Sequence, residues 1–237
     1  MFSNFQKTIR SEITFKGIGL HTGKNVNLKL IPSNQDTGIV FKRTDIDNSK
    51  NIVFANYTNV ISAKFCTKLQ NEFGVSVSTV EHLLGALYGE GIDNLLIEVD
   101  GPEVPILDGS AIKFLNGIRS VGIQKQAAIR KIINVERKIE IKSGSKYISI
   151  EPKKKNLEID FELIYANDLI GKQRENVNFQ KDDLSQIYNS RTFCLFEDIE
   201  QIKKIGLAKG GSLDNAIVVK NDKIINEDGL RHKNEFV

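Results

Sequence analysis

Cysteine is scarce in this sequence of 237 residues, with only Cys66 and Cys194 far apart along the chain. Two distant cysteines argue against a disulfide framework and against a zinc site built on cysteine, so a bound metal would need histidine and carboxylate ligands. There is also no apolar run of 18 residues, which argues against a transmembrane helix. The first residues lack the apolar centre of a signal peptide, and we therefore expect a cytoplasmic protein.

Tryptophan is absent, and the net charge is only +3. The one dense basic run, residues 153–155, follows Pro152 and is interpreted as a solvated turn. Nucleic-acid surfaces combine basic residues with stacking aromatic side chains over longer stretches. The sequence therefore predicts no nucleic-acid partner.

Apolar residues make up 40% of the chain, which is enough for one or two hydrophobic cores of ordinary size. Alternating apolar residues predict strands within residues 11–43, and short strands and turns within 52–77. The 3.6-residue spacing of Val80, Leu83, Leu84 and Leu87 predicts a helix that ends near Gly89 or Gly91. A buried strand over 92–99 and a second amphipathic helix after Asp108-Gly109-Ser110 are expected to follow.

The second half repeats landmarks of the first at an offset of about 120 residues. The matched pairs are Pro32 with Pro152, Asp93 with Asp214, and Asp108 with Asp228. A period this long indicates two sister domains rather than a solenoid. We therefore predict an α+β protein of two duplicated domains, residues 1–127 and 128–237. In the second domain a helical region is expected over 182–204, interrupted at 189–192.

The segment Ser78-Thr79-Val80-Glu81-His82 opens the first predicted helix. Ser78 and Glu81 have the spacing of a capping box, in which Glu81 would reach back to the Ser78 amide and His82 would be a half-buried helix residue. The alternative is that the adjacent carboxylate and imidazole carry chemistry. The ten residues from Ser78 to Leu87 leave both interpretations open.

The Gly210-Gly211-Ser212 turn near the end of the chain also has two interpretations. Its backbone amides could cradle an anion. More often, such a turn is only a tight connection, here into the strand that follows.

Several motifs together resemble those of one family, the UDP-3-O-acyl-N-acetylglucosamine deacetylases, which are zinc amidohydrolases of lipid A biosynthesis. The motifs are Gly19-Leu20-His21-Thr22-Gly23, Ser78-Thr79-Val80-Glu81-His82, Gly91-Ile92-Asp93-Asn94, Pro105-Ile106-Leu107-Asp108-Gly109-Ser110-Ala111, Ser190-Arg191-Thr192-Phe193, Gly210-Gly211-Ser212 and Asn226-Glu227-Asp228-Gly229-Leu230-Arg231. The resemblance runs in order from about Thr8 to the last residue. It implies that each domain is a β-sheet with helices on one face, and that the helices are sandwiched between the two sheets.

The resemblance also implies roles for individual residues. His82 matches the first zinc ligand, Glu81 the general base, and Thr192 a hydroxyl that helps to hold the oxyanion. The positions implied to line or support the substrate site are His21, Phe193, Gly210, Ser212 and Asp198. The implied cofactor is Zn²⁺, and the implied substrate is a UDP-linked acylated N-acetylglucosamine whose acetamide is hydrolysed to release acetate.

One departure from the family pattern is large. In the family, Glu-Phe-Val, here residues 235–237, is followed by a segment that supplies the second and third zinc ligands and the presumed general acid. His232 precedes this motif, so we reject it as a substitute ligand. We therefore expect this chain to be a fragment, incomplete in its second domain and inactive by itself. The alternatives are an inactive homologue that binds nucleotide sugars, and an α+β scaffold in which Glu81 is only a helix cap.

Overall fold

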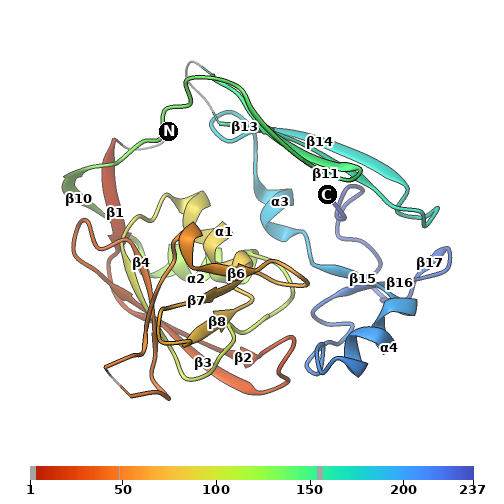
Figure 1. Ribbon diagram of the computed structural model, residues 1–237, viewed down its shortest axis with the longest axis horizontal. Helices are drawn as coiled ribbons and strands as arrows, with labels where there is room; N and C mark the ends of the chain where they lie inside the picture. Colours follow the sequence, from red (N-terminus) through yellow and green to blue (C-terminus); the bar gives the residue numbers. More distant parts are fainter. Residues whose placement is uncertain (1–3, 48, 154–156) are drawn as a thin grey trace.

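The computed structural model describes residues 4–47, 49–153 and 157–237. Two parts of the chain follow one another (Figure 1): the first part ends with the strand at residues 123–129, and the second part is the chain that follows this strand. The first part is built on a five-stranded sheet of order β2-β3-β9-β4-β5. Its strands are β2 (Ile13–Ile18), β3 (Asn25–Pro32), β4 (Ile39–Arg43), β5 (Ile52–Phe54) and β9 (Leu95–Val99). β9 runs antiparallel to β3 and parallel to β4, so it is the central strand.

Alternation along β3 explains which face of the sheet is buried. Val26, Leu28 and Leu30 are buried, whereas Asn25 and Asn27 between them are exposed. A strand with this period of two turns one face to the core and the other to solvent.

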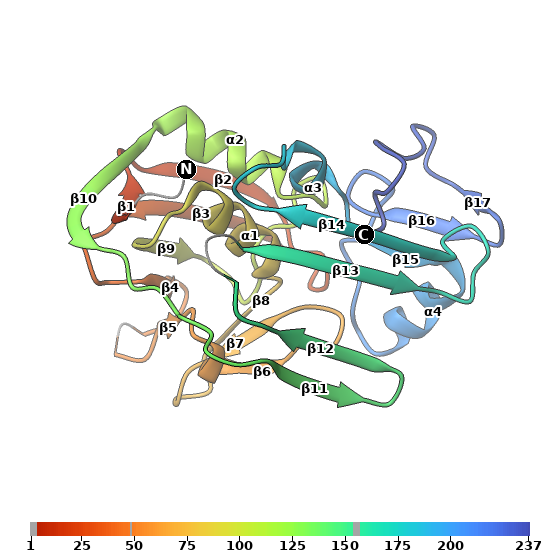
Figure 2. The ribbon, with the colours of Figure 1, turned by 90° about the horizontal axis from the view of Figure 1, so that it is seen from above.

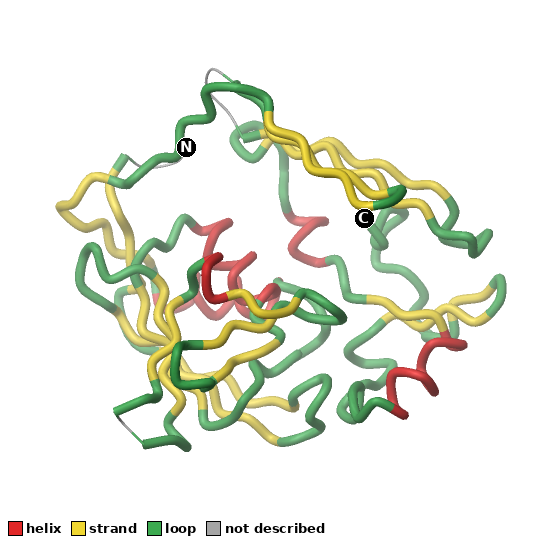
Figure 3. Tube along the Cα trace, in the orientation of Figure 1, coloured by secondary structure: helices red, strands yellow, loops and turns green. Residues whose placement is uncertain are grey.

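Two helices, α1 (Glu81–Glu90) and α2 (Ile112–Val121), complete the core of this first part, and Figure 3 shows them close together. The side chains that they bury include Leu83, Leu87, Phe114, Leu115 and Ile118, all within one cluster that also holds the inner residues of the sheet. Gly91 ends α1 in the left-handed region, with φ 68°, as the sequence predicts for a helix C-terminus. The expected helices therefore form where apolar spacing places them.

Smaller elements border the sheet. β1 (Phe5–Ile9) pairs antiparallel with β10 (Ile123–Ile129), which brings the chain that leaves α2 back to the N-terminal strand. A three-stranded sheet contains β6 (Val60–Ser62), β7 (Lys68–Gln70) and β8 (Ser76–Ser78), and a 3₁₀ turn, η1 (Tyr57–Asn59), precedes it. The short strands and turns expected for this stretch are confirmed.

The described strands of the second part form three separate small sheets. Two are hairpins, and the third has the order β15-β16-β17. The elements are β11 (Ile139–Ser143), β12 (Lys146–Ile150), β13 (Glu158–Ile164), β14 (Lys172–Asn178), α3 (Ser185–Asn189), β15 (Phe193–Leu195), α4 (Phe196–Lys204), β16 (Ile217–Lys220) and β17 (Lys223–Ile224). The mixed α+β class is confirmed, but these three sheets differ from the one sheet expected for this domain.

One part of the helix prediction is wrong. Residues 193–195, expected to begin the second stretch of helix, form the strand β15, which pairs in parallel with β16. α4 connects these two strands as a crossover. Apolar residues at Phe193 and Leu195 fit both a helix stripe and a buried strand, and the partner strand more than 20 residues away decides between them.

The two hairpins lie side by side along one side of the molecule (Figure 2). Many of their apolar side chains are exposed, including Ile141, Tyr147, Ile148 and Ile164 at 64–70% of their surface. Within the described residues, the apolar cluster of this part is small and is formed around Ile217, Val219 and Phe236. Stability in the second part thus depends on few buried side chains.

The proposed duplication stays a prediction. β9 and β16 each lie between one parallel and one antiparallel neighbour. However, β3 pairs with β9, whereas β12, which the offset matches to β3, pairs with β11. The boundary between residues 127 and 128 falls inside β10.

The sequence predicts no transmembrane helix and a solvated basic turn at residues 153–155. In the described ranges, no helix has both the length and the apolar character needed to cross a membrane. The basic run at 153–155 lies largely outside the described residues, since 154 and 155 belong to the gap.

Candidate active site at the junction of the two parts

The first turn of α1 presents Glu81 and His82 without a capping box. Ser78 belongs to β8, and both its amide and its hydroxyl donate to the Pro102 carbonyl, at 2.9 and 3.1 Å. The N-cap residue is Val80, and no side chain caps the helix. Of the two interpretations left open for this segment, the capping box is therefore wrong.

Glu81 is instead held by the loop just before β7. Its Oε2 accepts a hydrogen bond of 3.0 Å from the Thr67 amide, next to β7. Its Oε1 has no hydrogen-bond partner among the described residues. One oxygen thus fixes the carboxylate while the other stays free to accept a proton.

His82 is half-buried beside this carboxylate. Burial lowers the pKa of His82, while the negative charges of Glu81 and Asp108 partly oppose that shift. The neutral imidazole is therefore favoured at pH 7. Within the described part of the chain, its ring nitrogens make no hydrogen bond.

A wholly buried carboxylate, Glu103, holds the backbone just before this helix. It accepts hydrogen bonds of 2.8 Å from the amides of His21 and Thr22 and from the hydroxyl of Thr79. Thr79 has φ 56°, a conformation that is strained for a β-branched residue. The Thr79–Glu103 hydrogen bond helps to maintain that conformation two residues before Glu81.

Glu103→Gln is expected to reduce the free energy of unfolding by about 1–3 kcal/mol, because an amide nitrogen replaces one acceptor oxygen facing buried donors. Urea unfolding measures the loss. Glu72→Gln, the same change at an exposed turn residue, is the control and should leave stability unchanged. Equal stability of the two variants would contradict the assigned role of Glu103.

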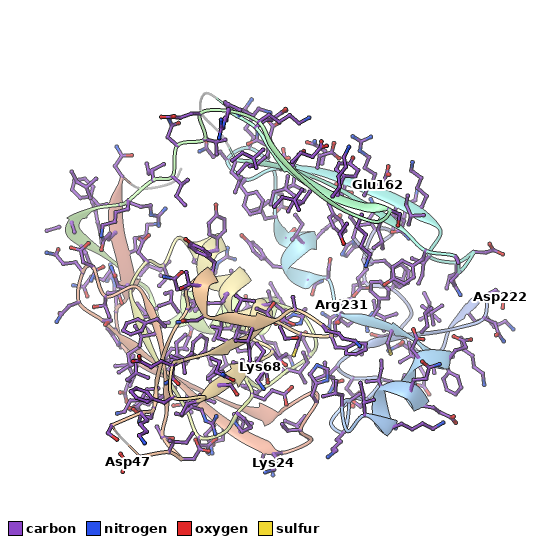
Figure 4. The ribbon with its side chains drawn as sticks, viewed as in Figure 1. Lys24, Asp47, Lys68, Glu162, Asp222 and Arg231 are labelled. Atoms are coloured by element: carbon purple, nitrogen blue, oxygen red, sulfur yellow. The ribbon has the colours of Figure 1, made fainter. Side chains whose placement is uncertain are left out.

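The loop at Asp108 joins the two parts of the chain. Asp108 forms an ion pair of 3.0 Å with Arg231, and the Gly109 carbonyl accepts a hydrogen bond of 2.8 Å from the Thr192 amide. Figure 4 labels Arg231 between the two parts. These contacts place Thr192, from the second part, against the loop whose Asp108 influences His82.

Thr192 itself is half-buried, and its hydroxyl has no hydrogen-bond partner among the described residues. The backbone on both sides of the residue is fixed, because its carbonyl accepts from the Ile217 amide at 2.8 Å. A hydroxyl that is free on a fixed backbone can donate to an incoming oxygen.

Two glycines allow this close approach. A Cβ at Gly109, which has φ 80°, would lie 2.1 Å from the Asn215 carbonyl oxygen. A Cβ at Gly210 would lie 2.3 Å from the Gly19 carbonyl oxygen. Both neighbours are backbone atoms of the opposite part, so they cannot move aside as a flexible side chain could.

Gly210→Ala is therefore expected to separate the two parts locally and to cost about 1–3 kcal/mol of stability, as overpacking usually does. Thermal and urea unfolding measure the loss. Gly211→Ala is the matched control, because a Cβ there would meet its nearest atom at 3.4 Å. If both variants were equally stable, the junction would be looser than described.

A buried ion pair holds the last residues of the chain against the entry to β15. Arg191 pairs with Glu235 at 2.8 Å and with Asp228 at 3.0 Å. Burial alone would raise the pKa of Glu235, but hydrogen bonds from the Arg191 side chain and from the amides of Arg231 and Arg191 outweigh it and lower that pKa. The Ser-Arg-Thr-Phe motif is thus joined to residues 228–235.

The residues predicted to line the substrate site do not all lie in the same kind of environment. His21 is buried at the junction, where its carbonyl accepts from the Lys209 amide. Phe193 packs edge-on against Tyr165 and Phe236, as a core residue does. Asp198 and Ser212 are exposed. Within the described residues, no hydrogen bond or ion pair connects these two to Glu81, His82 or Thr192.

The Gly210-Gly211-Ser212 turn does not form an anion cradle. The three amides donate to the Leu20 carbonyl, the Ala208 carbonyl and the Asn215 side-chain oxygen. All three donors are therefore used within the protein, and the turn is a tight connection.

The sequence motifs did not indicate a role for Glu103, for Asp108 as an ion-pair partner, or for Arg231. Each of these residues lies in or beside a motif that contains glycine or proline. That context was the available signal. It does not reveal the partner, since Asp108 and Arg231 are separated by 123 residues.

The residues present do not by themselves fit a zinc centre. No group of three or more His, Cys, Asp or Glu side chains within the described ranges is arranged to hold a metal ion. A catalytic zinc needs three protein ligands. Among the described residues, the His82 imidazole, Glu81 Oε1 and the Thr192 hydroxyl are without hydrogen-bond partners.

Comparison with known proteins gives a consistent result over almost the whole chain. Residues 6–237 match the family described as LpxC: UDP-3-O-acyl N-acetylglycosamine deacetylase. The UDP-3-O-acyl-N-acetylglucosamine deacetylase of Mannheimia succiniciproducens is 44% identical over 236 residues, which are 98% of this chain and 76% of that protein. The proteins of the same name from Actinobacillus pleuropneumoniae and Campylobacter hominis are each 40% identical over 98% of this chain, and the matches cover 76% and 78% of their lengths.

Proposed function

This chain belongs to the UDP-3-O-acyl-N-acetylglucosamine deacetylase family, and from that premise we propose that it serves the hydrolysis of the acetamide of UDP-3-O-(3-hydroxyacyl)-N-acetylglucosamine. The products are acetate and the free amine, and the reaction belongs to lipid A biosynthesis. A cytoplasmic location is part of this proposal.

Two observations carry the proposal: the Glu81 carboxylate is held through one oxygen by the Thr67 amide, and Thr192 is held by its amide against the Gly109 carbonyl. Glu81 Oε1 would accept a proton from the attacking water, while the bond from Thr67 to Oε2 keeps the carboxylate in position. The Thr192 hydroxyl would donate to the oxygen that becomes negative in the tetrahedral intermediate. Both groups are positioned by backbone contacts before substrate binds.

His82 is proposed as one ligand of the zinc ion that the sequence resemblance implies. The same resemblance assigns the other ligands to a segment that this sequence does not contain. We therefore propose that the chain of 237 residues by itself holds zinc weakly and turns over little substrate. His21, Phe193, Gly210, Ser212 and Asp198 stay assigned to the surroundings of the substrate.

Zinc content tests the metal part of the proposal. After dialysis, the chain of 237 residues is expected to retain well below one zinc per protein, because one imidazole is short of three ligands. In a longer form that carries the additional segment of its relatives, stoichiometric zinc is expected, and His82→Ala should lose it. One tightly held zinc in the shorter chain would contradict this assignment.

Acetate release from the UDP-sugar tests the reaction itself. The longer form is expected to release acetate and free amine in equal amounts. Binding of the UDP-sugar without turnover in that form would instead support the alternative function, an inactive homologue that binds nucleotide sugars. Failure to bind the sugar at all would contradict both.

A further inference from the structure

The first part of the chain exposes a run of apolar side chains at η1 and β6. Tyr57 is 87% exposed, Ile61 is 52% exposed and Val60 is 41% exposed. Phe54, the last residue of β5, is 55% exposed. We name residues 54–61 the apolar edge. Four apolar side chains within eight residues thus lie at the surface together.

The pairing of β6 explains why these side chains stay outside the core. Within the described residues β6 pairs with β7 alone, and Figure 2 shows it farther than β7 from the five-stranded sheet. The register between β6 and β7 shifts between Val60 and Ser62, so Ile61 lies at a bulge without a cross-strand partner. A bulge bends a strand and redirects its side chains. The cavity of about 380 Å³ at the junction is lined by Ser62 and Lys68 of this sheet, but by none of residues 54–61.

An aromatic ring with a lysine beside it lies at each end of the apolar edge. Phe65, in the turn after β6, is 46% exposed and has φ 67°, a conformation that is uncommon for any residue except glycine. The Lys64 ammonium lies 5.4 Å from the centroid of this ring. Lys50, just before β5, lies 5.9 Å from the centroid of the exposed Phe73 ring.

The charge around the apolar edge has one sign. Residues 48–71 contain three lysines, Lys50, Lys64 and Lys68, and no aspartate or glutamate. None of the three takes part in an ion pair within the described residues. Aromatic and aliphatic side chains next to basic groups are the combination that binds at the boundary between anionic lipid headgroups and acyl chains.

From this arrangement we propose that the apolar edge docks on a membrane surface that carries anionic lipids. Tyr57 and Ile61 enter the boundary between headgroups and acyl chains, while Lys50 and Lys64 approach the headgroup phosphates. A strand added to β6 fits this edge less well, because β6 has only three residues and its bulge interrupts the ladder. The contact is peripheral and does not depend on the proposed reaction.

Sedimentation of the chain with lipid vesicles tests the proposal. Saturable binding is expected with vesicles of phosphatidylglycerol and phosphatidylcholine in equal parts, and much weaker binding with phosphatidylcholine alone. Tyr57→Ser/Ile61→Ser should bind the mixed vesicles at least about tenfold more weakly, because two side chains lose their apolar burial. Absence of saturable binding, or equal affinity of this variant, would overturn the proposal.

The matched control is Tyr147→Ser/Ile148→Ser. It makes the same two changes in β12, where the side chains are also exposed, at 70% and 69%. This variant should keep the affinity for the mixed vesicles. An equal loss in both double variants would show a general effect of apolar surface and would also overturn the site. Circular dichroism checks that each variant is folded.

The lysines are tested separately. Lys50→Gln/Lys64→Gln should bind the mixed vesicles at least about tenfold more weakly, because each lysine near an anionic surface contributes to binding. Lys113→Gln/Lys223→Gln removes the same charge at two exposed lysines elsewhere and should bind as the unmodified chain does. Equal affinity of the two lysine variants would overturn the assignment to anionic lipid.

A fluorescence measurement keeps the apolar character of the edge. The chain has no tryptophan, so Tyr57→Trp supplies a single probe. Its emission should shift to the blue when mixed vesicles are added, and brominated lipid should quench it. Tyr147→Trp should show neither change. An unshifted spectrum of Tyr57→Trp would contradict insertion of the edge into lipid.

Sedimentation velocity without lipid examines the other occupant, a second copy of this chain. A dimer that is lost in Tyr57→Ser/Ile61→Ser, together with no vesicle binding, would assign the edge to self-association and overturn the lipid assignment. A monomer that binds the mixed vesicles supports the proposal. No arm of the experiment uses deacetylation, so failure of this surface and failure of the proposed function remain distinguishable.

Discussion

Glu81→Gln is expected to lower acetate release by at least about 10²-fold in a catalytically competent form of the protein, the usual scale for a lost general base. Glutamine keeps the shape of the side chain and an oxygen that can accept from the Thr67 amide. It has no basic oxygen to accept a proton from water. The measurement is the initial rate of acetate release at saturating and at low substrate.

The control is the same substitution at the other end of α1. Glu90→Gln removes an ion pair with Arg119, in which the Arg119 side chain is exposed and that of Glu90 is mostly covered, and is expected to leave the rate unchanged. Zinc content should be equal in both variants, because His82 is retained. Near-normal turnover of Glu81→Gln would show that its carboxylate only fixes the loop before β7.

Arg191→Met is expected to reduce the free energy of unfolding by about 3–5 kcal/mol, because it leaves the charge of Glu235 buried without its partner. The Glu235 side chain has 0% exposure, and that of Arg191 has 2%. Urea unfolding, followed by a probe in the second part of the chain, measures the loss. The double variant Arg191→Met/Glu235→Leu should recover part of it.

The stability of this ion pair should also depend on pH in a defined direction. The folded-state pKa of Glu235 is lowered, so the stabilisation is present above the unfolded value of about 4.3 and is lost as the pH falls below it. Arg191→Met should weaken this acid dependence.

Arg174→Met is the matched control, since it removes the arginine of an ion pair with Asp160 in which both side chains are largely exposed. Solvent screens such a pair, and a much smaller loss is expected. Similar losses in the free energy of unfolding in both arginine variants would show that the burial of Arg191 does not strengthen its ion pair.

Local patterns in the sequence were sufficient for α1, α2 and the strands of the first sheet. The apolar spacing of Leu83 and Leu87, and the glycine that ends α1, act over single helical turns. The alternation in β3 acts over pairs of residues. Such signals are reliable because the same few neighbours determine both the pattern and the conformation.

The capping box and the helix at 193–195 failed for one shared reason, which is competition from distant partners. Ser78 is bound by Pro102 and Glu81 by Thr67, so neither needs the other. Phe193 has a strand partner in Ile217. Propensity and spacing contain no information about which of these longer-range contacts forms.

For the candidate site, too, some features follow from the local sequence and others only from tertiary contacts. The sequence by itself determined the family, the α+β class and the adjacent pair Glu81-His82, because these follow from local motifs and their order. Only the tertiary structure decided that Thr192 is held against the Asp108 loop and that Glu103 supports the strained Thr79. Contacts between the two parts join residues up to 190 positions apart, as between Leu20 and Gly210, and such proximity arises only when the two parts pack against each other.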